Sequence, residues 1–302
     1  MFFKNARIFQ ITGTLPHETL ELSLQEIPAR ECGSLEQTVS GWASPTSTVG
    51  GTLVHRQLKI DMLRLVTHTK VMPTAVINKK TAERVSEIEQ KEARIVRKRE
   101  QQQIKDDVIL DMLPRAFQRQ RDTYGYIDYS EKLLIINAAS NTEALDFIAA
   151  LRKVLGKCPV MPLTTTASPS AVMTGWLTDP PTPGGIDLED EAVLALPAEG
   201  DKATLKHHDM ESDEVAAHIE AGKAVDKLRV CWMDKISATI ESDLALKRIK
   251  FSDIVAEQVA DIEGNDNASR FDADLSIMTA ELGECISYLI KVFGGIQRAE
   301  NA

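Results

Sequence analysis

Apolar and polar residues alternate in four stretches of this chain, which is the pattern of half-buried β-strands. Residues 3–11 alternate in this way at the start, and residues 58–69 do so again shortly before Pro73. Residues 124–140 predict a hairpin of two strands, and residues 228–251 predict an antiparallel meander.

In other stretches the apolar residues recur at helical spacing. The clearest is residues 141–156, where Asn141 is the expected N-cap and Gly156 the C-terminal stop. Residues 268–293 predict a long apolar helix that forms core or a subunit contact. Shorter helices are predicted over residues 17–25, 168–177, 187–196 and 211–221, the last with Gly222 as its C-cap.

A charged stretch from Lys79 to Arg121 predicts one long helix, because no Gly or Pro interrupts it before Pro114, which stops or kinks it. A helical wheel places Val85, Ile88, Ile95 and Val96 on one stripe and Arg84, Lys91, Arg94, Lys98 and Lys105 on a second. At ~1.5 Å per residue the basic stripe spans about 31 Å, enough to follow a phosphate backbone. Glutamates in the same stretch leave open a solvated face with i,i+4 ion pairs.

Two segments are rich in turn residues, 40–51 and 178–185. The second, TDPPTPGG, is the strongest boundary signal. Strands and helices are mixed without βαβ regularity or an internal repeat, which favours an α+β fold with antiparallel sheets and long helices.

The composition is that of a soluble protein of one large or two ordinary domains, with 302 residues, 43% hydrophobic and 26% charged. The sequence has no signal-peptide pattern and no apolar run near the ~18 residues that span a bilayer, so we expect a cytoplasmic protein without membrane contact. The formal net charge is −10, yet residues 79–121 hold twelve Lys and Arg against eight Asp and Glu. This asymmetry leaves open a nucleic-acid binder that is basic on one surface and acidic elsewhere.

Catalytic motifs are missing from the sequence. Neither Gly-Gly pair builds a phosphate-binding loop, and no G-x-S-x-G or H-E-x-x-H occurs. The four cysteines lack the close pairs of a zinc site, and His207, His208 and His218 lack metal-ligand spacing. We therefore expect no catalytic residue, no metal and no cofactor.

A second basic cluster, Lys223, Lys227 and Arg229, surrounds the start of the predicted meander. Lys227 and Arg229 fall on the strand face opposite Leu228 and Val230, which predicts one buried and one cationic face. Ordinary alternation with polar residues outward gives the same pattern.

Phe117 stands between Arg115, Arg119 and Arg121, just after Pro114. It is either a core residue or an apolar plug at a contact with a second copy or another partner.

The chain contains, in order, FFKNARIFQIT, MLPRAF, YIDYSEKLLIINAAS, LRKVLGKCPVMPL, HIEAGKAVDKL, LALKRIKFSD and SRFDADLSIMTAEL, from near residue 1 to about residue 295. Together these segments resemble the bacterial RdgC family of recombination-associated proteins. The resemblance implies a homodimer of elongated, curved subunits closed into a ring around a hole wide enough for duplex DNA. It also implies binding of double-stranded DNA with little sequence preference, binding of single strands, restraint of RecA-promoted strand exchange, nucleoid association and a link to replication fork repair.

The resemblance also assigns residues. Basic positions that line the hole correspond to Arg94, Arg115 and Lys223, and the apolar residue of the gate between subunits corresponds to Phe117. To these DNA contacts we add the neighbouring basic residues Arg84, Lys91, Lys98, Lys227 and Arg229. His207 and His208 stand where the family tends to place a polar pair containing Lys, which lowers the charge there at neutral pH.

We expect three regions: a central α+β region of residues 1–74 and 122–178, a helical tip and gate region of residues 75–121, and a C-terminal α+β region of residues 179–302 with base dimer contacts.

Two other functions stay open. One is a coiled-coil-like interaction protein whose helix Lys79–Met112 and C-terminal helix bind protein partners, with incidental DNA affinity. The other is a nuclease, which would need clustered carboxylates around a divalent metal.

Overall fold

The computed structural model describes residues 2–46, 51–196, 200–255 and 267–297. The first of its two sheets has seven strands in the order β2-β4-β5-β6-β1-β7, with β3 also paired to β4. These strands are β1 (Arg7–Ile11), β2 (Thr38–Ala43), β3 (Val54–Gln57), β4 (Ile60–Val71), β5 (Phe117–Asp128), β6 (Leu133–Ile136) and β7 (Val160–Pro162). Helices α1 (Leu20–Leu24) and α4 (Asn141–Leu155) pack on one of its faces.

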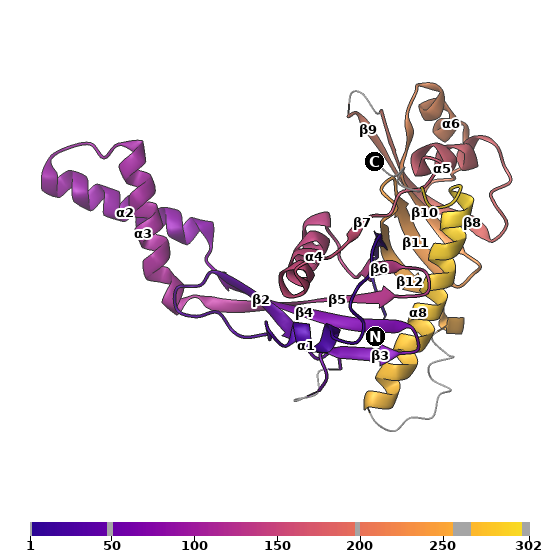
Figure 1. The fold of residues 1–302 in the computed structure, drawn as a ribbon. Coiled ribbons are helices and arrows are strands. Elements are labelled where there is room, and N and C mark those ends of the chain that lie inside the picture. Colours follow the sequence, from indigo (N-terminus) through magenta and orange to yellow (C-terminus); the bar gives the residue numbers. More distant parts are fainter. Residues whose placement is uncertain (1, 47–50, 197–199, 256–266, 298–302) are drawn as a thin grey trace.

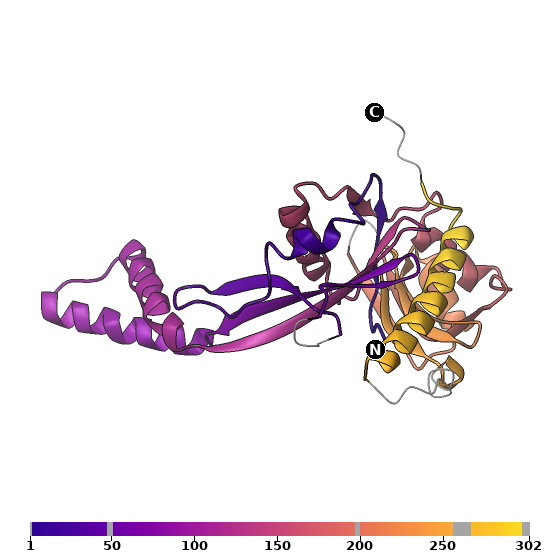
Figure 2. The same cartoon turned by 60° about the horizontal axis from the view of Figure 1, so that its bottom comes forward.

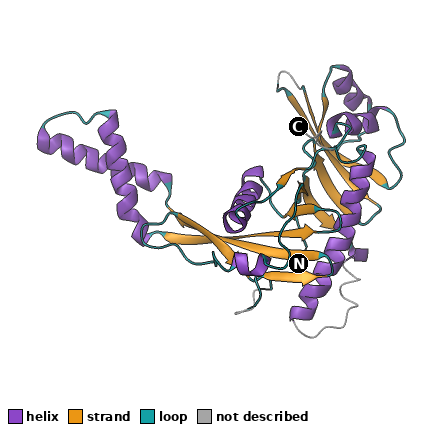
Figure 3. Ribbon diagram, in the orientation of Figure 1, coloured by secondary structure: helices purple, strands orange, loops and turns teal. Residues whose placement is uncertain are grey.

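The second sheet has five strands in the order β12-β11-β10-β8-β9. They are β8 (Ile186–Ala195), β9 (Lys202–Lys206), β10 (Ala224–Trp232), β11 (Ile236–Glu241) and β12 (Leu246–Phe251), accompanied by helices α5 (Pro169–Thr178), α6 (Asp213–Glu220) and α8 (Asn267–Val292). The named strands pair antiparallel throughout both sheets. The architecture is therefore α+β with antiparallel sheets, as the sequence predicts (Figure 3).

Period-2 alternation divides the first sheet between two hydrophobic cores. Phe9 and Ile127 face α1 and α4. The residue that precedes each of them, Ile8 and Tyr126, lies on the opposite face and belongs to a core shared with the second sheet and α8. The two sheets are also joined directly, because Ala6 and Leu246 exchange both backbone hydrogen bonds. The central and C-terminal parts thus share one continuous core.

Strands β4 and β5 form a long ribbon that extends away from this core. They pair along their full length, from Ile60 opposite Asp128 to Val71 opposite Phe117. At the far end the chain forms a helical hairpin of α2 (Thr74–Glu92) and α3 (Lys98–Met112), closed by the 3-10 turn η1 (Leu113–Arg115). In Figure 1 this hairpin and the second sheet rise on the same side of the ribbon, with α4 between them. The subunit is elongated and curved (Figures 1 and 2), and we call its concave side the inner face.

The single long helix predicted from Lys79 to Arg121 is wrong. The chain turns back at Ala93, which adopts a left-handed conformation with φ of 50°, and residues 117–121 belong to β5. Val96 is buried at the turn, and Ile77, Ile104 and Val108 are buried between the helices, so packing rather than local composition holds the hairpin. The predicted 31 Å basic stripe therefore does not exist.

Three further local predictions need correction. The acidic helix predicted over residues 187–196 is wrong, because residues 187–195 belong to strand β8, between β9 and β10, where the buried positions are Ile186, Ala192 and Leu194. Residues 40–43 belong to strand β2 rather than to a loop, and residues 47–50 of that predicted loop lie outside the described part. The cap of α4 is Ser140, whose Oγ accepts a hydrogen bond from the Glu143 backbone N–H at 3.1 Å.

Other predictions from the pattern are confirmed: the opening strand, the hairpin of residues 124–140, the meander, and helices α1, α4, α5, α6 and α8. Pro114 also ends the helical run as expected, since α3 stops at Met112. Among the described residues, no helix is both long and apolar enough to cross a bilayer.

Candidate nucleic-acid interface

The inner face of the β4–β5 ribbon carries hydroxyl and guanidinium groups in two consecutive rungs. Cross-strand pairing aligns Ser40, Thr67 and Arg121 in one rung. The same pairing aligns Thr38 with Thr69, and Thr69 with Arg119, in the next. Because side chains two residues apart on a strand share a face, both rungs point to the same side of the sheet.

Helix α4 identifies that side as the inner face. Thr123, which follows Arg121 at the same strand periodicity, donates a hydrogen bond from its hydroxyl to Glu143 of α4 at 3.0 Å. The guanidinium of Arg121 lies beside the same helix, 3.6 Å from Glu143 and 3.9 Å from Asp146. These two distances are too long for good hydrogen bonds, so much of the donor capacity of Arg121 is unused.

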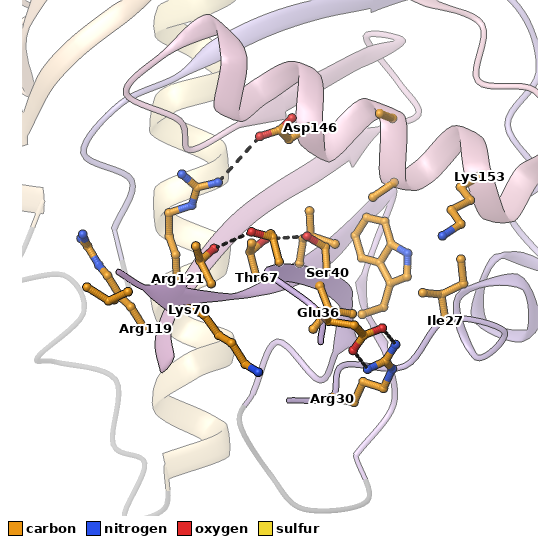
Figure 4. Close-up of a pocket in the computed structure, with 18 residues that line it drawn as sticks. Ile27, Arg30, Glu36, Ser40, Thr67, Lys70, Arg119, Arg121, Asp146 and Lys153 are labelled. Carbon is orange, nitrogen blue, oxygen red and sulfur yellow. Dashed lines mark hydrogen bonds and ion pairs between the residues drawn. The ribbon is translucent and has the colours of Figure 1, made fainter. Parts of the chain in front are cut away.

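A cavity of about 920 Å³ lies over these rungs, which we call the inner-face recess (Figure 4). Its floor is the hydroxyl-bearing face of β2 and β4. One wall is the side of α4 that presents Asp146, Ala149, Ala150 and Lys153. The opposite side is formed by Ile27 and by the loop that carries Arg30 and Glu36.

Charges around the inner-face recess are unevenly compensated. Arg30 is neutralised by Glu36 through two hydrogen bonds of 2.5 and 2.7 Å, and the hydrogen bond from Arg30 lowers the pKa of Glu36 to about 2. Lys70 is tied to the backbone carbonyls of Gly33 and Ser34. Arg119 and Lys153, by contrast, are exposed and have no ion pair within the described part of the chain. The recess is therefore a cationic site on an acidic protein.

The next rung along the ribbon is apolar and leads to the helical hairpin. Phe117 lies opposite Val71, and 87% of its surface is exposed. It borders a hollow of about 680 Å³ whose lining includes Lys80, Arg84 and Arg115. Arg84 is paired with Asp111 at 2.5 Å, whereas Arg115 has no ion pair among the described residues.

Arg94 stabilises the hairpin turn. Its guanidinium donates hydrogen bonds to Glu92 at 2.6 Å and to both carboxylate oxygens of Glu100 at 2.7 and 2.5 Å. The hydrogen bond from Arg94 lowers the pKa of Glu100, so that carboxylate stays ionised. Lys91 and Lys98, on either side of the turn, are exposed without an ion pair among the described residues.

The three basic residues predicted to contact DNA near the second sheet, Lys223, Lys227 and Arg229, are each ion-paired. Lys223 lies 3.3 Å from Asp201, and Lys227 lies 2.7 Å from Glu241. Arg229 is buried, with 8% of its surface exposed, and pairs with Glu189. The face of β10 that carries Lys227 and Arg229 is thus compensated by carboxylates on neighbouring strands.

His207 and His208 lie beside the same sheet and contact acidic and hydroxyl groups. His207 Nδ1 lies 2.8 Å from Asp190, and this hydrogen bond lowers the pKa of the Asp190 carboxyl. His208 Nε2 lies 3.2 Å from the Ser212 hydroxyl and 3.3 Å from Glu214. Within the described ranges, no three His, Cys, Asp or Glu side chains are grouped so that they could hold a metal.

The structure brings together Arg84, Arg115 and Phe117 at the base of the hairpin. Arg94, at the hairpin turn, and Lys223, between α6 and β10, lie at opposite ends of one subunit (Figure 1). No role for Arg119, Arg121 or Lys153 is predicted from the sequence. The alternation Arg115, Phe117, Arg119, Arg121 would have indicated a strand with one cationic face, had the stretch not been interpreted as helix.

Comparisons with known proteins agree with the resemblance seen in the sequence. A family model described as "Putative exonuclease, RdgC" matches residues 1–296. A protein of Psychromonas ingrahamii named "Recombination-associated protein RdgC" is 38% identical over 300 residues, covering 98% of this chain and 99% of its own. Proteins of the same name from Halorhodospira halophila and Actinobacillus pleuropneumoniae serotype 5b are 38% and 40% identical, each covering 98% of both chains.

Proposed function

Because the chain belongs to the RdgC family of recombination-associated proteins, we propose that it binds double-stranded DNA without sequence preference and encircles it as a ring-shaped homodimer. In this role it modulates homologous recombination by restraining strand exchange promoted by RecA, is associated with the nucleoid and has no catalytic activity of its own. It also binds single-stranded DNA.

The observation that supports this function is a series of cations without a carboxylate partner in a protein with excess acid. Asp and Glu number 45 against 35 Lys and Arg, so the surface as a whole carries excess negative charge. Nevertheless the exposed side chains of Lys91, Lys98, Arg115, Arg119 and Lys153 have no ion pair within the described ranges. They follow one another from the hairpin along the ribbon to α4. Unpaired surface cations in such a series suit a ligand with regularly spaced negative charge, such as a phosphate backbone.

Contacts to phosphates carry no sequence information, whereas base-edge contacts do. Binding through these cations is therefore expected to be independent of sequence.

The concave inner face of the subunit supports binding of a rod-like polyanion, and two such subunits facing each other would enclose one. In that arrangement Phe117, exposed at the hairpin end of the ribbon, is the apolar contact to the partner subunit at the gate. The C-terminal region supplies the second, base contact.

The expected DNA contacts divide into two groups by their surroundings. Lys91, Lys98 and Arg115 can approach a phosphate directly. The others, Arg84, Arg94, Lys223, Lys227 and Arg229, each have a carboxylate partner whose charge opposes a phosphate. We propose that the first group contributes most of the affinity, and that the second group contributes through the summed field of the surface. A ring on duplex DNA then restrains strand exchange, because it occupies the duplex that the RecA filament would engage.

Duplex binding is expected to depend steeply on salt. If six to ten phosphates are neutralised, the logarithm of affinity falls with the logarithm of salt concentration at a slope of about −5 to −9. Fluorescence anisotropy with two duplexes of unrelated sequence, titrated at several salt concentrations, measures the slope, and the two affinities should agree within a few-fold. A flat salt response, or strong preference for one duplex, would contradict the proposal.

Two alternatives are tested with the same duplexes. A helical scaffold that binds proteins through α2, α3 and α8, with incidental DNA affinity, would show no gel shift at physiological salt. The description of the family model as an exonuclease favours a test for cleavage. Duplex recovered after incubation with Mg²⁺ would be shortened by a nuclease, whereas the proposed function leaves its length unchanged.

A further inference from the structure

The floor of the inner-face recess repeats one set of donors. The first rung has the hydroxyls of Ser40 and Thr67 beside Arg121, and the second has those of Thr38 and Thr69 beside Arg119. The rungs are two residues apart, or about 6.8 Å along the strand. A repeated donor set suits a ligand that repeats its acceptor at that interval, and neighbouring phosphates along a nucleic-acid strand are separated by a similar distance.

Each rung has a free hydroxyl hydrogen. Ser40 Oγ and Thr67 Oγ1 lie 2.9 Å apart, and Thr38 Oγ1 lies 3.4 Å from Thr69 Oγ1. A pair of hydroxyls has two hydrogens and uses only one to bond within the pair. The second hydrogen is therefore available to an acceptor in the recess, next to a guanidinium with unused donors.

The recess is amphipathic across its width. Arg119 and Arg121 lie on the ribbon side, and Lys153 extends from α4. Ala149 and Ala150 of α4, and Ile27 on the opposite side, supply apolar wall in the same recess. Nucleotides have the same division, with a charged phosphate joined to a sugar and base that present apolar surface.

The recess admits one strand rather than two. Thr67 on the floor is buried, with 9% of its surface exposed, and Ser40 is half-buried, so a ligand must enter between α4 and the loop of Arg30 and Glu36 to reach them. A duplex carries its phosphates on the outside of a broad cylinder, which cannot enter a cavity of about 920 Å³. A single strand is thin enough to enter.

We infer that the inner-face recess binds the sugar-phosphate backbone of one nucleic-acid strand, with neighbouring phosphates on successive rungs. This inference rests on the proposed function, since it assigns a specific site to single-stranded DNA within a DNA-binding protein. The duplex is held by the hairpin cations and by exposed Arg119 and Lys153, whereas the floor hydroxyls contact only a single strand.

The test removes the deeper hydroxyl pair with the double variant Ser40→Ala/Thr67→Val. Both hydroxyls leave together, so neither is left buried without its partner, and valine keeps the shape of threonine. Affinity for a labelled oligothymidylate, measured by anisotropy, is expected to fall at least about three- to tenfold, which is the effect of losing one hydrogen bond of ordinary net strength. Affinity for a duplex of equal length is expected to stay unchanged. The control variant is Thr204→Val, because Thr204 is an exposed strand residue of the second sheet. Its affinities for the single strand and for the duplex are both expected to stay unchanged.

Three results would overturn the inference. The single-strand affinity of the double variant could match that of the unmodified protein, or its duplex affinity could fall by the same factor. Inorganic phosphate or thymidine monophosphate could displace the oligothymidylate as effectively as an unlabelled oligothymidylate does, which would show a site for isolated phosphates. Absence of DNA binding by the unmodified protein would instead contradict the proposed function.

Discussion

The double variant Lys98→Glu/Arg115→Glu is expected to bind duplex DNA about a hundredfold more weakly than the unmodified protein at roughly 0.15 M salt. Lys98 begins α3 and Arg115 ends η1, so the two side chains belong to opposite ends of the hairpin's second helix. Each has no ion pair among the described residues, so its charge is available to a phosphate. Reversal removes a contact and adds repulsion at two places. Anisotropy with the two unrelated duplexes should show the same loss for both, and the salt slope should become shallower by about two.

Net charge is matched by the control Lys59→Glu/Lys132→Glu. Both lysines are exposed on neighbouring turns, where the Tyr129 N–H donates a hydrogen bond to the Lys59 carbonyl. These turns lie at the end of the ribbon opposite Phe117. If the control weakened duplex binding as much as the hairpin variant does, overall charge rather than the hairpin would determine affinity.

The second large effect is expected from Phe117→Ser. Because 87% of the Phe117 surface is exposed, the substitution should change the stability of one subunit by no more than about 0.5 kcal/mol. Burial of a phenylalanine against a partner contributes about 1.5–3 kcal/mol. The lifetime of the protein on circular duplex should therefore fall about 10- to 100-fold, while the initial affinity for a short duplex changes little.

Ile95→Ser is the matched control, since Ile95 is also apolar, 84% exposed and on the hairpin. Lifetimes are measured from the release of labelled protein from bead-bound circular DNA. Equal lifetimes for Phe117→Ser and the unmodified protein would show that Phe117 does not close the gate. Equal losses in the two variants would show a general effect of exposed apolar residues.

The parts of the fold that follow from local pattern could be predicted from the sequence. Strands β1, β4 and β10 carry partly alternating apolar and polar residues, and β6 is a short apolar run that is buried on both faces; both patterns are visible in the sequence. The long apolar line of α8 is equally local. Membership of the family was also evident from the order of its segments.

The errors arose where tertiary contacts override local preference. Residues 79–112 contain no Gly or Pro to signal a reversal at Ala93. The reversal is stabilised by the ion pairs of Arg94 with Glu92 and Glu100 and by the burial of Val96, Ile104 and Val108, and helical propensity reports none of these contacts. Strand β8 has the composition of an acidic helix. Its carboxylates Glu189 and Glu191 are stabilised by Arg229 and Arg248, which lie some forty and more residues further along the chain.

The same limit applies to the candidate site. Counting basic residues cannot distinguish a free cation such as Arg115 from Lys223 or Arg229, because each partner carboxylate comes from a different strand or loop. The inner-face recess combines side chains of β2, β4, β5 and α4 that are up to 115 residues apart, from Thr38 to Lys153. Only the pairing of the strands shows that their hydroxyls and guanidiniums repeat in register.

Retention on circular and linear forms of one plasmid tests the encircling ring most directly. Protein is loaded at low salt onto bead-bound relaxed circles and onto the same plasmid cut once with free ends, and salt is then raised until direct phosphate contacts are screened. A closed ring stays on the circles and slides off the linear DNA, so a large difference in retained protein is expected. Equal release from the two forms would show that the protein binds duplex DNA without enclosing it.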